Sequence, residues 1–168
     1  MSTVPDAHRQ AAGAAGLPCA IITCSDTRSE VDDRSGPIMK SLLELAGHEI
    51  VSYEVVREDP ALIRSALERA AARARIVLLN GGTGVSPRDN TVDVVRAFVE
   101  RDLPGFGELF RTLSYQEIGA AAMLSRAVAG TRGATAVFAT PGSSAAVTLA
   151  MEKLILPEIR HLASLLDG

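Results

Sequence analysis

The sequence has few features that would cross-link the chain or anchor it in a membrane. It contains no tryptophan and two cysteines, Cys19 and Cys24, which are five positions apart in an apparent strand. Their side chains should point to opposite faces about 16 Å apart, too far for a disulfide. No apolar run approaches the roughly 20 residues of a membrane span. We therefore expect a cytoplasmic protein with no disulfide and no membrane partner.

The sequence also lacks a basic cluster. Its formal net charge is −3, whereas surfaces that hold nucleic acid by bulk charge are strongly basic. This argues against a nucleic-acid partner. A phosphorylated ligand is compatible with the sequence, but its negative charge would have to be met by local donors or by a metal ion.

The hydrophobic share of 47% and the charged share of 22% are ordinary for a globular protein, and 168 residues can form one sizeable core. The first residues are rich in Ala, Gly and Pro and lack the apolar block of a signal peptide. We predict a flexible N-terminal tail over residues 1–18 and a single domain over residues 19–168.

Apolar periodicity predicts an alternation of strands and helices. Residues 103–107 predict a turn, and Pro157 predicts a kink in the last helix. The alternation is typical of an α/β fold with a doubly wound, mostly parallel sheet flanked by helices in three layers. Strands are expected over residues 19–24, 50–56, 76–79, 126–130 and 134–139, and helices over about 36–46, 60–74, 90–100, 108–118 and 144–166.

The stretch Ile76 to Thr91 (IVLLNGGTGVSPRDNT) is the centre of this pattern. An apolar run that ends in glycines predicts a buried strand opening into a binding loop, because glycine lets the backbone approach a ligand closely. The loop is not a P-loop, since no lysine follows the glycines. It is not the GxGxxG dinucleotide motif either, because the third glycine is absent.

Polar clusters follow four of the predicted strands. If those strands are parallel, the clusters meet at one edge of the sheet, where ligands of open α/β sheets bind. Carboxylates beside phosphate-binding amides suit Mg²⁺ and favour nucleotidyl or phosphoryl transfer. The clusters are Ser25-Asp26-Thr27, Glu58-Asp59, Gly81 to Asp89 and Thr140 to Ser144.

Five motifs, in order and spacing, resemble the MoaB/MogA family of molybdenum cofactor biosynthesis proteins, and most closely its MoaB branch. They are SDTRSEVDDRSGP, GGTGVSPRD, PGFGELFR, LSRAVAG and ATPGSS, and the resemblance covers about Ala20 to Leu166. It implies the doubly wound α/β domain, a homotrimer or hexamer, and Mg²⁺-dependent adenylylation of molybdopterin by ATP with release of pyrophosphate. It also implies a downstream molybdate-insertion protein as a partner.

The resemblance assigns roles by position. Asp89, Glu58 and Asp59 become catalytic candidates, with Asp89 and Glu58 as ligands of Mg²⁺. The expected substrate-binding residues are Gly81, Gly82, Thr83, Gly84 and Ser86 for the pterin and phosphate, Thr140, Pro141, Gly142, Ser143 and Ser144 in a second ligand loop, and Ser25, Asp26 and Asp33 near the nucleotide.

One position departs from the family pattern. Active members usually have aspartate, often within PDE or PDD, where this chain has Glu58. An alternative is therefore a catalytically inactive molybdopterin-binding protein of the same pathway. A further alternative is a nucleotide-cleaving enzyme on the same domain, as in a competence-damage-related family. Individual residues also have simpler explanations, because Asp89, Asp59 and Ser143 could cap helices and Arg126 could pair with a carboxylate.

Overall fold

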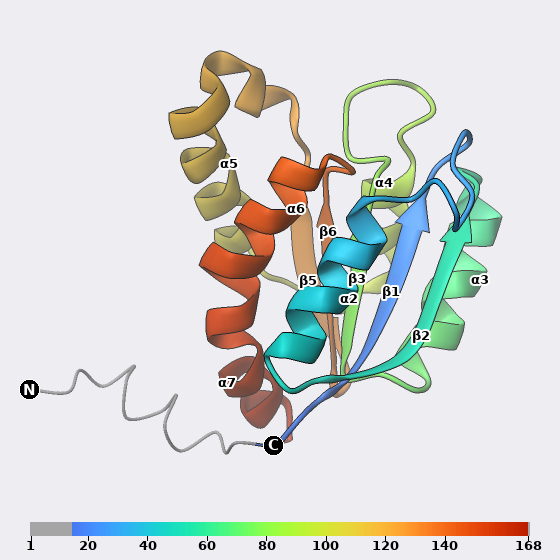
Figure 1. Cartoon of the computed structure of the whole chain (residues 1–168), viewed down its shortest axis with the longest axis vertical. Coiled ribbons are helices and arrows are strands. Elements are labelled where there is room, and N and C mark those ends of the chain that lie inside the picture. The colour runs from blue at the N-terminus through green and yellow to red at the C-terminus, as the bar shows by residue number, and fades with distance from the viewer. Residues whose placement is uncertain (1–14, 168) are drawn as a thin grey trace, which may run out of the picture.

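Six strands form one sheet in a computed structural model that describes residues 15–167 (Figure 1). The strand order is β2-β1-β3-β6-β5-β4. β1, β2, β3 and β6 are mutually parallel, whereas β5 and β4 run antiparallel to their neighbours. The predicted mostly parallel sheet is confirmed. The strands are β1 (Pro18–Cys24), β2 (Glu49–Val56), β3 (Ile76–Asn80), β4 (Arg101–Asp102), β5 (Val128–Arg132) and β6 (Thr135–Thr140).

Helices cover both faces of the sheet, which confirms the three layers (Figure 1). One face packs against α2, α5, α6 and α7, and the other against α3 and α4. The helices are α2 (Ser35–Leu45), α3 (Pro60–Ala71), α4 (Thr91–Phe98), α5 (Pro104–Ile118), a 3-10 segment η1 (Gly119–Leu124), α6 (Ser144–Ala150), a π-helical segment η2 (Met151–Ile155) and α7 (Leu156–Leu166).

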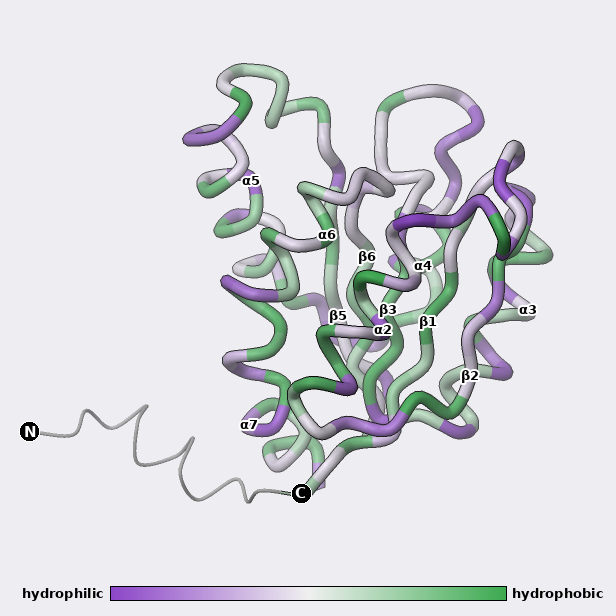
Figure 2. Tube along the Cα trace, in the orientation of Figure 1, coloured by the Kyte–Doolittle hydropathy of each residue, from purple (hydrophilic) through white to green (hydrophobic). Residues whose placement is uncertain are grey.

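The central strands divide their side chains between two apolar cores. In β1, Ile21 packs into the core under α2 and α5, and Ile22 packs into the core under α3 and α4. Successive strand residues point to opposite faces, so a strand covered on both sides is apolar throughout. Figure 2 shows these strands as predominantly hydrophobic tubes between helices of mixed colour. Cys19 and Cys24 lie in different cores as free thiols, as the spacing predicted.

One local expectation around residue 103 is wrong, and one short strand nearby was missed. Residues 104–107 form the first turn of α5, because Pro104 occupies the first helical position, where a missing N–H costs nothing. The two-residue strand β4, which pairs with Gly130 and Thr131 of β5, has no apolar pattern and was not predicted. The turn residues Pro and Gly are therefore the start of a helix here.

The last helical run extends from Ser144 to Leu166, as predicted, and is irregular just before Pro157. The N–H of Leu156 donates to the carbonyl of Met151, a π-type hydrogen bond that ends η2. Pro157 cannot donate to the carbonyl four residues earlier. A π-helical turn is a common way for a helix to absorb such a defect.

The sequence before β1 is fixed to the sheet by one buried histidine. Most of the tail predicted over residues 1–18 lies outside the described residues, but Pro18 already belongs to β1. The N–H of Leu17 donates to Nδ1 of His48 at 3.1 Å. His48 is therefore neutral at this nitrogen, and it is buried rather than on the surface. Within residues 15–167 no helix is both long enough and apolar enough to span a membrane.

We expect His48 to make folding stability pH-dependent. Burial, and secondarily the guanidinium of Arg160, lower the pKa of His48. The unfolded chain therefore binds a proton more readily, so stability is complete above the unfolded pKa of about 6.5 and falls as the pH drops below it. Urea unfolding at about pH 7.5 and about pH 5.5 should show the loss, at about 1.4 kcal/mol per unit of pKa difference.

His48→Gln should remove part of this loss. The same loss in His48→Gln and in the wild type would contradict the assignment.

Candidate active site

The four loops that follow the parallel strands meet at one edge of the sheet. The N–H of Glu58 donates to Oδ1 of Asp26 at 3.1 Å, which joins the loops after β2 and β1. The N–H of Gly81 donates to the carbonyl of Thr140 at 3.0 Å, which joins the loops after β3 and β6. Asn90 Nδ2 donates to the carbonyl of Glu58 at 2.9 Å. The predicted convergence of the polar clusters is confirmed.

The loop after β3 approaches its neighbours too closely for a side chain. A Cβ on Gly81 would lie 2.2 Å from the carbonyl oxygen of Cys24, and a Cβ on Gly82 would lie 2.3 Å from Oγ1 of Thr91. Both residues have positive φ, of 91° and 63°, which L side chains adopt with difficulty. These two glycines therefore let the backbone turn directly over the end of β1.

Arg126 fixes the shape of the rest of this glycine loop. Its Nε donates to the carbonyl of Gly84 at 2.7 Å and its Nη2 to the carbonyl of Asp89 at 2.6 Å. Its Nη1 lies 3.1 Å from both carboxylate oxygens of Asp93. Its own N–H donates to the carbonyl of Thr83. The structural explanation for Arg126, pairing with a carboxylate, is confirmed.

Asp89 closes the glycine loop. Its Oδ2 accepts from the N–H of Ser86 at 2.8 Å, and its own N–H donates to the carbonyl of Ser86 at 2.9 Å. Gly84 lies under the same carboxylate, since a Cβ there would be 2.8 Å from Oδ2. Asn90, not Asp89, is the residue before the first turn of α4, and it makes no side-chain cap. Asp89 is therefore held by the loop and does not cap the helix.

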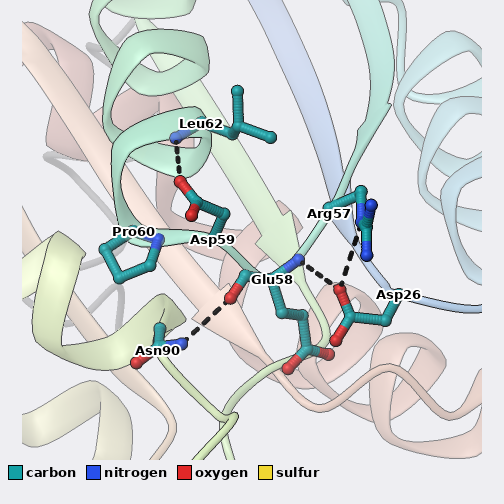
Figure 3. A pocket seen from close by; sticks show the side chains of 7 residues that line it. All are labelled: Asp26, Arg57, Glu58, Asp59, Pro60, Leu62 and Asn90. Carbon is teal, nitrogen blue, oxygen red and sulfur yellow. Dashed lines mark hydrogen bonds and ion pairs between the residues drawn. The ribbon is translucent and has the colours of Figure 1, made fainter.

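An acidic cleft of about 670 Å³ lies between the loops after β1, β2 and β3 (Figure 3). Asp26 and Glu58 project into it from adjacent loops. Burial, and then the charges of Asp89 and Asp26, raise the pKa of Glu58, which is partly offset by Arg88. The charges of Asp89 and Asp26 therefore act on Glu58, and a bound cation would relieve this repulsion. The residues that line the cleft are Asp26, Arg57, Glu58, Asp59, Pro60, Leu62 and Asn90.

The donors of this cleft fit a hard cation that shares its ligands with a substrate. Within residues 15–167 no group of three or more His, Cys, Asp or Glu side chains is arranged to hold a metal ion without other ligands. Mg²⁺ is commonly held by one or two carboxylates together with waters and substrate phosphates. Glu58 and Asp89 could supply such a pair of oxygen ligands.

Asp59 lies at the wall of the cleft, but its carboxylate caps a helix. Its Oδ1 accepts from the N–H groups of Ala61 at 2.9 Å and Leu62 at 3.0 Å, and Pro60 follows at the first helical position. Figure 3 shows this carboxylate turned toward α3, away from Glu58. The expectation that Asp59 belongs with the catalytic carboxylates is not supported by this geometry, because its oxygen already satisfies the helix start.

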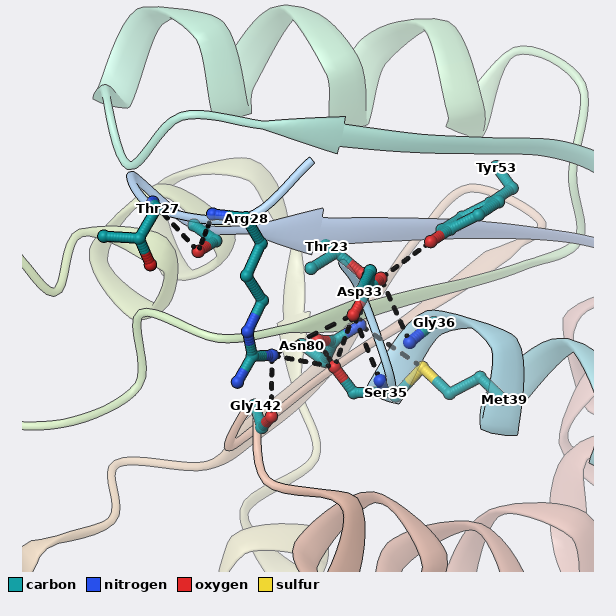
Figure 4. A network of polar contacts seen from close by, with 11 residues as sticks. Thr23, Thr27, Arg28, Asp33, Ser35, Gly36, Met39, Tyr53, Asn80 and Gly142 are labelled. Atoms are coloured by element: carbon teal, nitrogen blue, oxygen red, sulfur yellow. Dashed lines mark hydrogen bonds and ion pairs between the residues drawn. The ribbon is translucent and has the colours of Figure 1, made fainter. Parts of the chain in front are cut away.

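Asp33 lies beneath the loops and does not line the acidic cleft. Its side chain is fully buried. Its Oδ2 accepts from Thr23 Oγ1, from Tyr53 OH at 2.7 Å and from the N–H of Gly36 at 3.2 Å (Figure 4). Its Oδ1 accepts from the N–H of Ser35 at 3.1 Å. We therefore correct the expected ligand contact: the carboxylate is occupied by the protein's own donors.

These hydrogen bonds also set the charge of Asp33. Burial alone would raise its pKa, but the hydrogen bonds from Thr23, Tyr53, Ser35 and Gly36 outweigh burial and hold the pKa below its usual range. Asp33 is thus a buried carboxylate that stays ionised because its lone pairs are satisfied.

The second ligand loop, Thr140 to Ser144, connects β6 to α6. Ser143 caps α6, since its Oγ accepts from the N–H of Ala146 at 3.2 Å. Gly142 packs on Gly81, because a Cβ on Gly142 would lie 3.2 Å from the Cα of Gly81. Beside this loop is a mostly apolar hollow of about 250 Å³, lined by Thr83, Gly84, Phe110, Ser114, Ile118, Ala121, Ala122, Leu124, Ser125, Pro141, Ser143 and Ala146.

Ser25 supports the first loop from within. Its Oγ accepts from the N–H groups of Thr27 at 3.3 Å and Arg28 at 3.2 Å. Two residues that sequence reasoning missed connect this region to its neighbours: Arg28 reaches Gly142 in the loop after β6, and Asn80, at the end of β3, is hydrogen-bonded to Ser35. Asn80 is the polar last residue of an otherwise apolar strand, a signal that could have marked it. Arg28 lies in a polar loop and had no such signal.

Comparison with known proteins places this architecture in a family. Residues 20–161 match the family model MoCF_biosynth, described as "Probable molybdopterin binding domain". Molybdenum cofactor biosynthesis protein B of Bacillus subtilis is 53% identical over 147 residues, 86% of each chain.

Two crystal structures are also similar. A molybdenum cofactor biosynthesis protein B is 48% identical, with a TM-score of 0.88, and covers 92% of this chain and 98% of its own. The tungsten cofactor synthesizing protein MoaB from Pyrococcus furiosus is 34% identical, with a TM-score of 0.83, and covers 91% and 98%.

We expect Asp33→Ala to destabilise the protein strongly. The substitution leaves the buried Thr23 and Tyr53 hydroxyls without their acceptor. The free energy of unfolding, measured in urea, should therefore fall by about 3–5 kcal/mol. Asp32→Ala is the matched control, because Asp32 is exposed and its loss should change stability by no more than about 0.5 kcal/mol. Equal effects of the two substitutions would show that Asp33 does not organise the loops.

Proposed function

This chain belongs to the molybdopterin-binding-domain family of molybdenum cofactor biosynthesis, and on that premise we propose that it is a molybdopterin adenylyltransferase. In the proposed reaction an oxygen of the pterin's terminal phosphate attacks the α-phosphorus of ATP. The bond from that phosphorus to the oxygen bridging to the β-phosphate breaks, and its electron pair leaves with pyrophosphate. The products are adenylyl-molybdopterin and pyrophosphate.

The observation that carries the proposal is the meeting of the acidic cleft with the glycine loop. The substrate phosphate is its own nucleophile, so the protein has to position and neutralise charge and needs no catalytic serine or histidine. Asp89 lies close enough to Glu58 for its charge, after burial, to raise the pKa of Glu58. Gly81 and Gly82, in the loop after β3, carry no side chains, so a phosphate could approach the backbone there.

Mg²⁺ is part of the proposal, with Glu58 and Asp89 as the residues that would hold it. When bound, the ion would neutralise phosphate oxygens and orient them for in-line displacement. Asp89 is oriented for this role by the Ser86 N–H, which fixes Oδ2 at 2.8 Å. Arg126 holds the backbone of the same loop through the carbonyls of Gly84 and Asp89.

The apolar hollow beside the second ligand loop is the proposed pterin side of the site. It adjoins Thr83 and Gly84 of the glycine loop and Pro141 and Ser143 of the second loop, and its floor includes Phe110. A planar ring can be buried there by apolar contact. Gly81 and Gly82 would then lie between the pterin hollow and the acidic cleft, where the phosphate must be transferred.

An inactive pterin-binding protein is the second candidate, and one observation favours it. Asp59 caps α3, so Glu58 is the acidic residue that this loop directs into the cleft. Glutamate is one methylene longer than the aspartate of active relatives. Product formation from molybdopterin, ATP and Mg²⁺ distinguishes the two candidates, because tight pterin binding without product would support the inactive protein.

We expect Asp89→Asn to lower turnover at least about 100-fold while pterin binding changes by no more than about twofold. Asparagine keeps an acceptor for the Ser86 N–H, so the loop should retain its shape and lose only the charge. Asp102→Asn, a substitution at an exposed position of β4, should leave both quantities unchanged. Unchanged turnover in Asp89→Asn would remove Asp89 from the mechanism.

The assembly is proposed to be a homotrimer, or a hexamer built from trimers, that passes its product to a molybdate-insertion protein. Phe106 and Phe110 are only 8% and 0% exposed and belong to the core, so they are not available for such an interface. Exposed apolar residues nearby include Leu109 and Leu165. They line a groove of about 520 Å³ between α5 and α7, with Leu103, Pro104, Gly105, Phe106, Phe138, Lys153, Leu154, Pro157, Glu158, His161 and Leu162.

Light-scattering mass measurement should give a multiple of three times the 17.6 kDa chain. Leu109→Glu should shift the mass toward the monomer, because it places a charge in the proposed contact. Leu62→Glu is the control on α3, at the opposite face of the sheet, and should keep the wild-type mass. A monomeric wild type would refute the proposed assembly.

A further inference from the structure

Arg28 reaches from the loop after β1 to the loop after β6 (Figure 4). Its Nη1 donates to the carbonyl of Gly142 at 3.1 Å, a contact across 114 positions of the chain. The same nitrogen lies 3.3 Å from Oγ of Ser35 and 3.9 Å from Oδ1 of the buried Asp33. One corner of the guanidinium is therefore fixed by three groups of the protein.

The other donors of this guanidinium are unused. Within residues 15–167 neither Nε nor Nη2 of Arg28 has a hydrogen-bond partner, and 39% of the side chain is exposed. A guanidinium carries five N–H donors in a rigid plane. Because Nη1 makes the contacts to the protein, the N–H groups of Nε and Nη2 remain available to a ligand.

The guanidinium lies where the two ligand loops touch. A Cβ on Gly142 would be 3.7 Å from Nη1 of Arg28 and 3.2 Å from the Cα of Gly81. An anion placed on this glycine junction would therefore meet backbone on one side and the arginine fork on the other. The fork matches the spacing of two phosphate oxygens, and such charge-assisted bonds are about twice as strong as neutral ones.

Other arginines of these loops do not combine a fixed position with free donors. Arg126 uses Nε, Nη1 and Nη2 to hold the glycine loop. Arg57 is 78% exposed and its Nε faces Asp26 at 3.9 Å. Arg88 is exposed, and its charge acts on Glu58, whose pKa it lowers. Arg28 is thus the cation that can meet a phosphate without giving up a structural contact.

We propose that Arg28 binds a phosphate group of the substrate at the junction of Gly81 and Gly142. The inference rests on the proposed function. It adds a positively charged side chain to a site that otherwise consists of carboxylates and glycine backbone. The phosphate could be the terminal phosphate of the pterin or one of the phosphates of ATP, and the chemistry of recognition is the same for both. Arg28 is a substrate-binding residue in either case.

The test compares the wild type with Arg28→Gln, Arg28→Lys and Arg34→Gln by titration calorimetry. Each protein is titrated separately with molybdopterin, with its dephosphorylated form, and with ATP plus Mg²⁺. Arg34→Gln is the matched control, because it removes the same charge from an exposed side chain that makes no capping contact at the start of α2.

Arg28→Gln should weaken binding of the phosphorylated ligand that contacts Arg28 by about 10- to 100-fold. The dephosphorylated pterin should bind to Arg28→Gln and the wild type equally. Arg28→Lys keeps the charge but loses the fork, so its loss should be intermediate. Arg34→Gln should match the wild type. A selective loss for molybdopterin identifies the pterin phosphate, and a selective loss for ATP identifies the nucleotide.

Three results would overturn the inference, and they differ from failure of the proposed function. Equal weakening of phosphorylated and dephosphorylated pterin would make Arg28 a structural contact between loops. Unchanged binding of both phosphorylated ligands by Arg28→Gln would exclude a role in binding. If Arg28→Gln does not fold, wild-type affinity of Arg28→Lys for both phosphorylated ligands would exclude a role in binding instead. A wild-type protein that binds neither ligand would instead refute the proposed function itself.

Discussion

The ligand edge of this protein depends on the burial of one negative charge. A carboxylate removed from water is unfavourable unless its oxygens are fully hydrogen-bonded, and Asp33 meets this condition with donors from β1, β2 and the start of α2. Ser35 then links Asp33 to Asn80, whose Nδ2 donates back to Thr23 at 2.8 Å. The end of β3, and so the position of Gly81, is set by this network.

The general architecture could be predicted because it follows from local patterns. Apolar runs and polar junctions repeat along the chain, so the parallel strands and the shared edge of four loops were available from the sequence. The roles of individual aspartates were not, because they depend on distant partners. Asp32 and Asp33 are adjacent and chemically identical, yet only Asp33 meets Thr23 and Tyr53, which no local pattern connects to it.

Local signals left two stretches open to more than one interpretation. Asp59 and Pro60 are a helix-start signal, and the structure uses them that way, while the catalytic role that the family resemblance implies for Asp59 stays a prediction. Residues 104–107 carry turn residues, but Pro104 begins a helix because Phe106 and Phe110 are needed in the core beside Phe138. At residues 104–107, tertiary packing therefore decided between two conformations that the local sequence permits.

The two glycines at the start of the loop after β3, Gly81 and Gly82, restrict how this protein can change over evolutionary time. At Gly81 and Gly82 even an added methyl group would collide with Cys24 or Thr91, so nearly every mutation there would be eliminated by misfolding before ligand preference could matter. Residues 29–32 of the loop after β1 are different, since their side chains are exposed and meet few such constraints. New ligand specificities should therefore arise from substitutions in that loop, while Gly81 and Gly82 stay unchanged.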